Sequence, residues 1–157
     1  MALRHRPFTE ADAKEVADWQ YGPPYDIYNF GGWEKALAGG SGLTRPEIRA
    51  QEFYALEEDG LFAGFFRFME LDSGDHGMLS LGLRPALCGR GRGKELMALA
   101  KEEWAARCPH LPLRLEVRTF NQRARKQYEA AGFHAVRQYE RPTPSGVAEF
   151  LLMEWVP

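Results

Sequence analysis

The sequence predicts a mixed α/β (α+β) protein with a mostly antiparallel sheet of about seven strands and helices packed on it. Three observations lead to this class. Short apolar segments with strand-like spacing recur along the chain, longer segments with helical spacing lie between them, and two of the strand segments are joined by a tight turn that makes them antiparallel. The 157 residues are 45% hydrophobic, which is enough for one sizeable core. We therefore expect a single domain over residues 1–157.

The first predicted elements are a strand in "LRHRPF" (residues 3–8) and a helix that begins after Thr9. The hydroxyl of Thr9 can cap this helix, and Glu10 and Asp12 are favourable near its positive end. The following segment, residues 21–42, contains prolines and glycines that predict irregular structure. It is rich in Tyr, Phe and Trp, which distinguishes it from a flexible linker.

Three strands are predicted in the middle of the chain. Asp59-Gly60 is a strong signal for a two-residue hairpin turn, so we expect an antiparallel pair at Glu52–Glu57 and Leu61–Glu70. In "MLSLGLRP" (residues 78–85), every second residue is leucine, which is the pattern of a half-buried strand. Pro85 ends this strand.

The second half of the chain alternates helices and strands. A helix is predicted from about Gly93 to Arg107, because Leu96, Leu99, Ala100 and Trp104 share one of its faces. A strand in "LPLRLEVRTF", a helix that stops at a glycine, and two strands in "FHAVRQYE" and "VAEFLLMEWV" follow. The complete order is β-α-β-β-β-α-β-α-β-β.

Composition and charge argue against several classes of protein. The formal net charge is -2 and the isoelectric point is about 6.1, so a general attraction to nucleic acid is not expected. The longest apolar runs are far shorter than the roughly 20 residues of a membrane span, and the first residues lack the apolar middle of a signal peptide. We expect a cytoplasmic protein with no membrane partner. Cys88, Cys108 and four scattered histidines lack the spacing of a metal site, so no metal is expected.

Glycines alternate with cations directly before a predicted helix in the stretch "CGRGRGKELMALA" (residues 88–100). The glycines are Gly89, Gly91 and Gly93, and the cations are Arg90, Arg92 and Lys94. Amide groups at a helix start carry partial positive charge, and glycine lets an anion approach the backbone closely. The cations can neutralise phosphate oxygens. The stretch favours a phosphate cradle, and its alternative is a flexible turn with solvated charges.

Two common phosphate motifs do not match this stretch. A Walker loop requires glycine where Cys88 stands and Ser or Thr where Glu95 stands. A dinucleotide fingerprint requires G-x-G-x-x-G after the first strand, whereas these glycines alternate and follow several strands. Neither nucleotide hydrolysis nor dinucleotide binding is therefore indicated.

The chain resembles the GNAT superfamily of acetyl-CoA-dependent N-acetyltransferases in two separated signatures. The first is an apolar strand ending in V-x-P, then two residues, then Arg or Gln, x, x, Gly, x, Gly or Ala. It is matched by Leu83-Arg84-Pro85, Gly91 and Gly93, while Cys88 replaces the usual Arg or Gln. The second is matched in "VRTFNQRARKQYEAAGF" by Val117, Asn121, Ala124, Tyr128, Gly132 and Phe133. The resemblance covers about residues 78–140 specifically.

The resemblance implies a sheet with helices on both faces that is splayed between its fourth and fifth strands, where acetyl-CoA binds as co-substrate. The pantetheine arm would pair with the fourth strand at Leu81, Gly82 and Leu83, and close ligand approach or a bulge would explain the glycine. The pyrophosphate would lie on the amides of the 89–94 loop. Asn121 would contact the arm while capping its helix.

The resemblance also suggests how the chemistry is done. Tyr128 is similar in position to a tyrosine that serves many relatives as general acid near the sulfur of CoA. A phenol with a pKa near 10 keeps its proton at neutral pH and can donate it to a developing thiolate. The general base stays open among Glu116, for which salt pairing with Arg114 and Arg118 is an alternative, Glu70, and a water relay.

The acceptor is expected to be an amine-bearing molecule, and the aromatic segment at 21–33 is the candidate for its binding wall. Tyr25, Asp26 and Tyr28 are the residues that would contact the acceptor, and Asp26 could hold its cationic form. Plain packing of the aromatic rings is the alternative. The basic cluster Arg123, Arg125 and Lys126 could meet the 3′-phosphate of CoA or form a solvated helix face.

Two classes of function remain after these arguments. The first is an enzyme that transfers acetyl directly, in a ternary complex, to a primary amine on a small molecule, peptide or protein N-terminus. The second is a non-catalytic acyl-CoA-binding or sensor domain of the same fold. Nucleic-acid binding by "GRGRGK" lacks a supporting basic patch. The closing strands of relatives often take part in dimers, so a homodimer is a further expectation.

Overall fold

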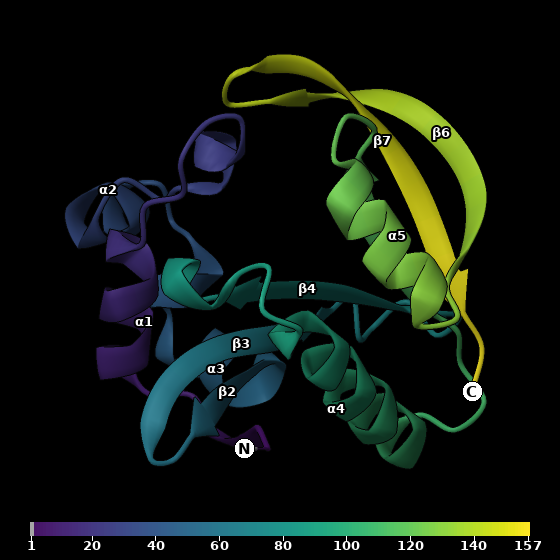
Figure 1. The fold of residues 1–157 in the computed structure, drawn as a ribbon, viewed down its shortest axis with the longest axis horizontal. Helices are drawn as coiled ribbons and strands as arrows, with labels where there is room; N and C mark the ends of the chain where they lie inside the picture. Colours follow the sequence, from purple (N-terminus) through teal and green to yellow (C-terminus); the bar gives the residue numbers. More distant parts are fainter. Residues whose placement is uncertain (1) are drawn as a thin grey trace. The chain divides into compact units, whose positions relative to one another are not determined.

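The computed structural model describes residues 2–157, which contain a seven-stranded sheet (Figure 1). The strands are β1 (Arg4–Pro7), β2 (Phe53–Glu58), β3 (Leu61–Met69), β4 (Gly77–Leu83), β5 (Leu113–Arg118), β6 (His134–Thr143) and β7 (Gly146–Trp155). The helices are α1 (Glu10–Asp18), α2 (Trp33–Ala38), α3 (Pro46–Glu52), α4 (Arg92–Arg107) and α5 (Gln122–Ala130). Short 3₁₀ turns are η1 (Tyr25–Tyr28), η2 (Gly42–Thr44) and η3 (Pro85–Leu87). The predicted mixed α/β class with a mostly antiparallel seven-stranded sheet is confirmed.

The order of strands in the sheet is β1-β2-β3-β4-β5-β7-β6. The chain divides into two compact units, one containing Leu81–Arg92 and the residues up to Arg67, the other Phe68–Ser80 and Gly93–Pro157. The division passes through β3 and β4 and through the first turn of α4. That the two units form one domain stays a prediction.

In the first unit, α1 packs its apolar face on β2 and β3. The predicted cap is present, because the Thr9 hydroxyl accepts from the amide of Asp12 at 3.2 Å and the Asp12 carboxylate accepts from the amide of Thr9 at 2.9 Å. Ala13, Val16 and Ala17 of the helix are buried. They belong to one core cluster with Phe8, Trp19, Leu43, Phe53, Ala55, Phe62 and Phe65.

The predicted hairpin between β2 and β3 is also confirmed. Asp59 and Gly60 both have positive φ, 53° and 81°, which is the backbone of a two-residue turn whose twist suits antiparallel strands. Glu58 and Leu61 form the last pair of the ladder beside the turn. The aspartate–glycine pair therefore sets the register of the two strands.

Two short helices were not predicted from the sequence. Helix α2 follows Gly32, whose φ is 99°, in a segment expected to be irregular, so that expectation was wrong. Helix α3 begins with Pro46 at its first position, where a fixed φ suits a helix. The two helices contain six and seven residues, which is less than the window over which helical spacing can be recognised.

In the second unit, β5, β7 and β6 form antiparallel ladders, and β6 and β7 make one long hairpin (Figure 1). Leu113, Leu115 and Val117 are buried and alternate with half-buried Arg114 and Glu116. Along α4, the buried residues are Gly93, Leu96, Met97, Ala100 and Trp104. The Trp104 ring meets the Phe68 ring at 5.0 Å between centroids and donates its N–H to the Leu111 carbonyl at 2.8 Å.

The parallel contact between β4 and β5 is short. Its ladder pairs Gly77 with Leu113 and Met78 with Arg114, and the next residues of the two strands, Leu79 and Leu115, are not paired. The strands therefore stop pairing near their beginnings. The splay between the fourth and fifth strands was expected at this position.

Candidate functional site

The glycine loop between β4 and α4 has a backbone that requires glycine at two positions. Gly89 and Gly91 have φ of 75° and 80°, in the left-handed region that other residues resist, and a Cβ added at either would meet no atom within 4 Å. The amide of Cys88 donates inward to the Pro85 carbonyl at 3.2 Å. Among residues 2–157, no acceptor takes the amides of Gly89, Arg90 and Gly91. Three consecutive amides are thus available to an anion.

The three cations of the loop differ in their surroundings. Arg92 makes a bidentate ion pair with Glu58, with Nε–Oε2 and Nη2–Oε1 distances of 2.5 and 2.8 Å. The hydrogen bond from Arg92 lowers the pKa of Glu58. Arg90 and Lys94 are exposed and have no acidic partner within the described part of the chain. Arg92 is thus neutralised by Glu58, whereas the other two cations are free to meet phosphate oxygens.

The peptide groups at the end of β4 alternate between two directions. The amide of Arg84 donates to the Ala63 carbonyl of β3 at 2.8 Å, so the peptide groups of Leu83 and Leu81 point away from β3. These are the positions at which the pantetheine arm is expected. The carbonyl of Leu83 already accepts a hydrogen bond from the Tyr21 hydroxyl at 2.6 Å.

Gly82 has a packing reason that the sequence does not reveal. A Cβ at this position would lie 2.7 Å from Cε1 of the Phe65 ring, and a Cβ at Gly64 would lie 2.5 Å from the Gly82 carbonyl oxygen. Both glycines are therefore required by close packing between β3 and β4. This contact explains Gly82 without the bulge or close ligand approach expected from the sequence.

Helix α5 carries the two candidate residues of the second signature. Asn121 is 7% exposed and caps the helix, because its side-chain oxygen accepts from the Ala124 amide at 3.1 Å. At the other end, the amide of Phe133 donates to the Tyr128 carbonyl and that of Gly132 donates to the Glu129 carbonyl, both at 3.0 Å. This pair of bonds is a Schellman motif, and Gly132 supplies its positive φ of 95°.

The two carboxylates considered as general base both have partners. Glu116 accepts from Arg141 at 3.1 Å and from the hydroxyl of Tyr139. Burial and the bond to Glu116 raise the pKa of Tyr139 to about 12. Glu70 lies 3.3 Å from Nε2 of His76. Salt pairing, which was one of the alternatives from the sequence, therefore accounts for Glu116. Its partner is Arg141 of β6 and not Arg114 or Arg118 of its own strand.

The segment expected to bind the acceptor forms a closed loop. Tyr25, Asp26 and Tyr28 lie in the turn η1, and Tyr28 is 39% exposed. The loop is closed by Asn29, whose side chain accepts from the Tyr21 amide at 2.8 Å and donates to the Tyr21 carbonyl at 3.3 Å. Asp26 is exposed, and its carboxylate has no hydrogen bond or ion pair to residues 2–157. Its carboxylate is available to a cationic ligand.

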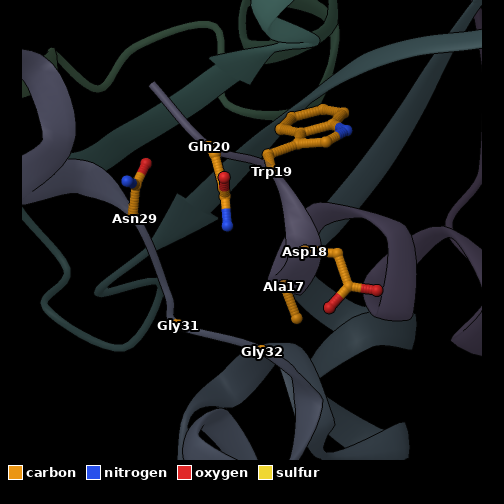
Figure 2. A pocket seen from close by; sticks show the side chains of 7 residues that line it. All are labelled: Ala17, Asp18, Trp19, Gln20, Asn29, Gly31 and Gly32. Carbon is orange, nitrogen blue, oxygen red and sulfur yellow. The ribbon is translucent and has the colours of Figure 1, made fainter. Parts of the chain in front are cut away.

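A cavity of about 330 Å³ lies beside this loop, between the end of α1 and the glycines that precede α2 (Figure 2). It is lined by Ala17, Asp18, Trp19, Gln20, Asn29, Gly31 and Gly32. Asp18 is a second carboxylate without a partner among residues 2–157. The sequence did not single out Asp18, because a polar residue at the end of an amphipathic helix is ordinarily solvated.

The basic cluster on α5 is heterogeneous. The Nε atom of Arg125 is buried and has no hydrogen-bond partner within the described residues, whereas Arg123 and Lys126 are exposed.

No group of histidine, cysteine and acidic side chains in residues 2–157 could hold a metal ion. No helix in the same residues is both long and apolar enough to cross a membrane.

Comparison with known proteins places this arrangement among acetyltransferases. A family model described as the acetyltransferase (GNAT) family matches residues 10–133. No curated protein matches the sequence significantly. A chimera of the spermidine N-acetyltransferase SpeG from Vibrio cholerae and hSSAT superposes with a TM-score of 0.80 at 16% identity, over 99% of this chain and 96% of that one.

Two further solved structures show the same fold. The acetyltransferase yncA from Salmonella typhimurium, determined with its cofactor acetyl-CoA, has a TM-score of 0.72 at 18% identity over 99% of this chain and 94% of that one. A ribosomal-protein alanine N-acetyltransferase from Escherichia coli has a TM-score of 0.66 at 21% identity, over 97% and 92% of the two chains. These likenesses establish the fold.

Proposed function

The chain belongs to the acetyltransferase (GNAT) family, and on that premise we propose that it transfers an acetyl group from acetyl-CoA to a primary amine by direct transfer in a ternary complex. The acceptor would be a small molecule, a peptide or a protein N-terminus. The similar structures support this range, because one is a chimera of a spermidine acetyltransferase and another is an acetyltransferase of a ribosomal protein.

One observation carries the proposal. The amides of Gly89, Arg90 and Gly91 have no acceptor in residues 2–157, and unbonded backbone donors in a left-handed turn form an anion-binding concavity. The side chains of Arg90 and Lys94 add two positive charges that no acidic residue neutralises. A diphosphate is the part of acetyl-CoA that fits such a set of donors.

The chemistry assigned to Tyr128 is proton donation. The neutral nitrogen of the acceptor attacks the thioester carbonyl, the carbon–sulfur bond breaks, and the departing thiolate takes the phenolic proton. The proton lost by the amine passes to water, from which the phenolate of Tyr128 recovers a proton. A positioned general acid contributes about 10²–10⁴-fold in rate, and the Schellman motif holds the backbone of Tyr128 in place.

The acceptor site is proposed to include Tyr25, Asp26 and Tyr28. The carboxylate of Asp26 has no partner in residues 2–157, so it can hold the ammonium form of the acceptor before deprotonation. We expect Asp26→Asn to raise the KM for the acceptor about tenfold, the value of a partly exposed charged hydrogen bond. Asp72→Asn is the matched control, because Asp72 is an exposed aspartate without a side-chain partner in residues 2–157 and does not belong to the candidate site.

The test is a thiol-release assay with acetyl-CoA and a panel of amines that includes polyamines, amino acids and peptides with free N-termini. Acetyl transfer above the uncatalysed rate supports the proposal. Acetyl-CoA binding by calorimetry without release of thiol by any amine of the panel would favour a non-catalytic binding domain. Absence of binding in buffer of low ionic strength would contradict both functions.

A further inference from the structure

We propose that Tyr21 couples the two substrate sites, because its hydroxyl ties the acceptor loop, residues 21–29, to the strand end at which the arm of acetyl-CoA would pair. The inference rests on the proposed function and adds a positioning residue to it. Tyr21 and Leu83 are separated by 62 positions in the chain, yet the Tyr21 Oη and the Leu83 carbonyl oxygen are 2.6 Å apart. All the residues concerned belong to the first compact unit.

The direction of the Leu83 carbonyl makes this contact relevant to acetyl-CoA. Because the amide of Arg84 is bonded to the Ala63 carbonyl of β3, the peptide groups of Leu81 and Leu83 point to the opposite edge of β4. That edge carries the hydrogen-bonding groups proposed for the pantetheine arm. A carbonyl oxygen has two lone pairs, so Leu83 can accept from the phenol and from an amide of the arm together.

The strand end is fixed by a second link to α1. A guanidinium nitrogen of Arg84, Nη2, donates to Glu15 of α1 at 2.8 Å and also to the Phe62 carbonyl. Arg84 therefore ties the end of β4 to β3 and α1 on one side, whereas the opposite edge, with the Leu83 carbonyl, is left for the arm of acetyl-CoA to order.

The other end of the link is the acceptor loop. Asn29 bonds both the amide and the carbonyl of Tyr21, at 2.8 and 3.3 Å, so the backbone of Tyr21 moves together with the end of the loop. Between these two residues lie Asp26 and the tyrosines proposed to contact the acceptor. Ordering of the β4 edge by acetyl-CoA would thereby be transmitted to the residues of the acceptor loop.

The phenol remains a hydrogen-bond donor throughout the working range of pH. Burial, with a smaller contribution from the nearby Cys88, raises the pKa of Tyr21 well above its ordinary value of 10.0. Ionisation of Tyr21 therefore does not interrupt the link. The coupling should be independent of pH between about 6 and 9, a range below the ordinary tyrosine pKa of about 10 and further below the raised pKa of Tyr21.

The decisive experiment measures amide hydrogen exchange of residues 21–29 in the full chain with and without saturating acetyl-CoA. In the wild type, we expect acetyl-CoA to slow exchange in this loop. Tyr21→Phe keeps the ring and removes the hydroxyl, so the hydrogen bond to the Leu83 carbonyl is lost. In this variant we expect the protection of the loop to be lost. The Kd for acetyl-CoA should rise about 3- to 10-fold, the value of one hydrogen bond, and the acceptor KM should rise as well.

Two variants separate coupling from a general effect on folding. Tyr54→Phe removes a phenol hydroxyl from β2 in the same unit, where the ring stacks on Phe66, and should leave the protection of the loop unchanged. Asn29→Ala removes the two hydrogen bonds between Asn29 and the backbone of Tyr21 but keeps the bond from Tyr21 to Leu83. It should therefore reduce protection of the loop without weakening acetyl-CoA binding.

The outcomes distinguish this inference from the proposed function. Protection of residues 21–29 that is equal in wild type and Tyr21→Phe would overturn the coupling, even if the melting temperature of the variant is lower. Acetyl-CoA binding and acetyl transfer by the wild type with no change in loop exchange would overturn the coupling and leave the enzyme activity intact. A wild type that does not bind acetyl-CoA would overturn the proposed function itself.

Discussion

Replacing Gly91 with aspartate places a carboxylate in the turn proposed to bind the diphosphate of acetyl-CoA. Gly91 is exposed, has a φ of 80°, and a Cβ built on it meets no atom within 4 Å. The new side chain therefore fits without overlap. The cost to folding is that of a non-glycine residue in the left-handed region, about 1–2 kcal/mol, which leaves a typical domain folded.

The effect on binding follows from the charge. A carboxylate about 5 Å from a phosphate charge repels it by about 0.8 kcal/mol in a medium like water and by about 3 kcal/mol at an effective dielectric constant of 20. With two phosphate charges, the smaller value corresponds to roughly a fifteen-fold increase in Kd. Titration calorimetry with acetyl-CoA at low salt measures this change. The loss should shrink as salt is added, because the site is exposed.

Two controls make the result specific. Gly91→Asn has nearly the same shape without the charge, so its Kd should lie close to that of the wild type. Gly74→Asp has the same backbone strain, because Gly74 has a φ of 78° and no atom within 4 Å of its Cβ position, but it is remote from the glycine loop in sequence. Equal Kd values for wild type, Gly91→Asp and Gly74→Asp would refute the proposed role of the loop.

Three further predictions test other parts of the molecule. Tyr128→Phe should lower kcat about a hundred-fold and change the Kd for acetyl-CoA far less; a wild-type kcat with a true acceptor would remove the phenol from the mechanism. Glu58→Gln releases Arg92 from its ion pair and should tighten acetyl-CoA binding about threefold by calorimetry; weaker binding would mean that the ion pair positions the loop. Burial opposes ionisation of Asp12, but the hydrogen bonds from Arg6 and Thr9 lower its pKa below 3.8, so its contribution to stability is present above about pH 4 and is lost as pH falls further. Urea unfolding should show Asp12→Asn less stable than wild type by about 2 kcal/mol at pH 7, and this difference should decrease steadily as the pH is lowered below 4; a difference independent of pH would contradict this origin.

Most of the sheet could be predicted because its signals are local. Alternation of leucine in β4 and the Asp59-Gly60 turn lie within a few residues of the structure that they specify. The short helix α2 escaped prediction because tertiary contacts and Gly32, and not periodicity, determine it. Local patterns therefore predict the long elements and miss the short ones.

The candidate site was only partly predictable, because its decisive contacts join residues distant in the chain. Arg92 and Glu58 are 34 positions apart, and Tyr21 and Leu83 are 62 apart. A motif can indicate that Arg92 is a cation near a phosphate site, but it cannot reveal that a carboxylate of a neighbouring strand already neutralises it. The same limit applies to Glu116, whose partners Tyr139 and Arg141 belong to a later strand.

Several residues of the family signatures and of the strand beside them have a structural reason that does not involve a ligand. Gly132 ends α5 in a Schellman motif, Asn121 caps the same helix, and Gly82 admits the Phe65 ring. Their presence alone therefore argues for the fold more strongly than for catalysis. Gly89 and Gly91 are different, because their positive φ leaves adjacent amides without an acceptor in residues 2–157, and an unbonded donor stabilises no part of the fold. Anion binding consequently depends on these loop amides, so the Gly91→Asp variant is a sharper test of function than any substitution at Asn121 or Gly132.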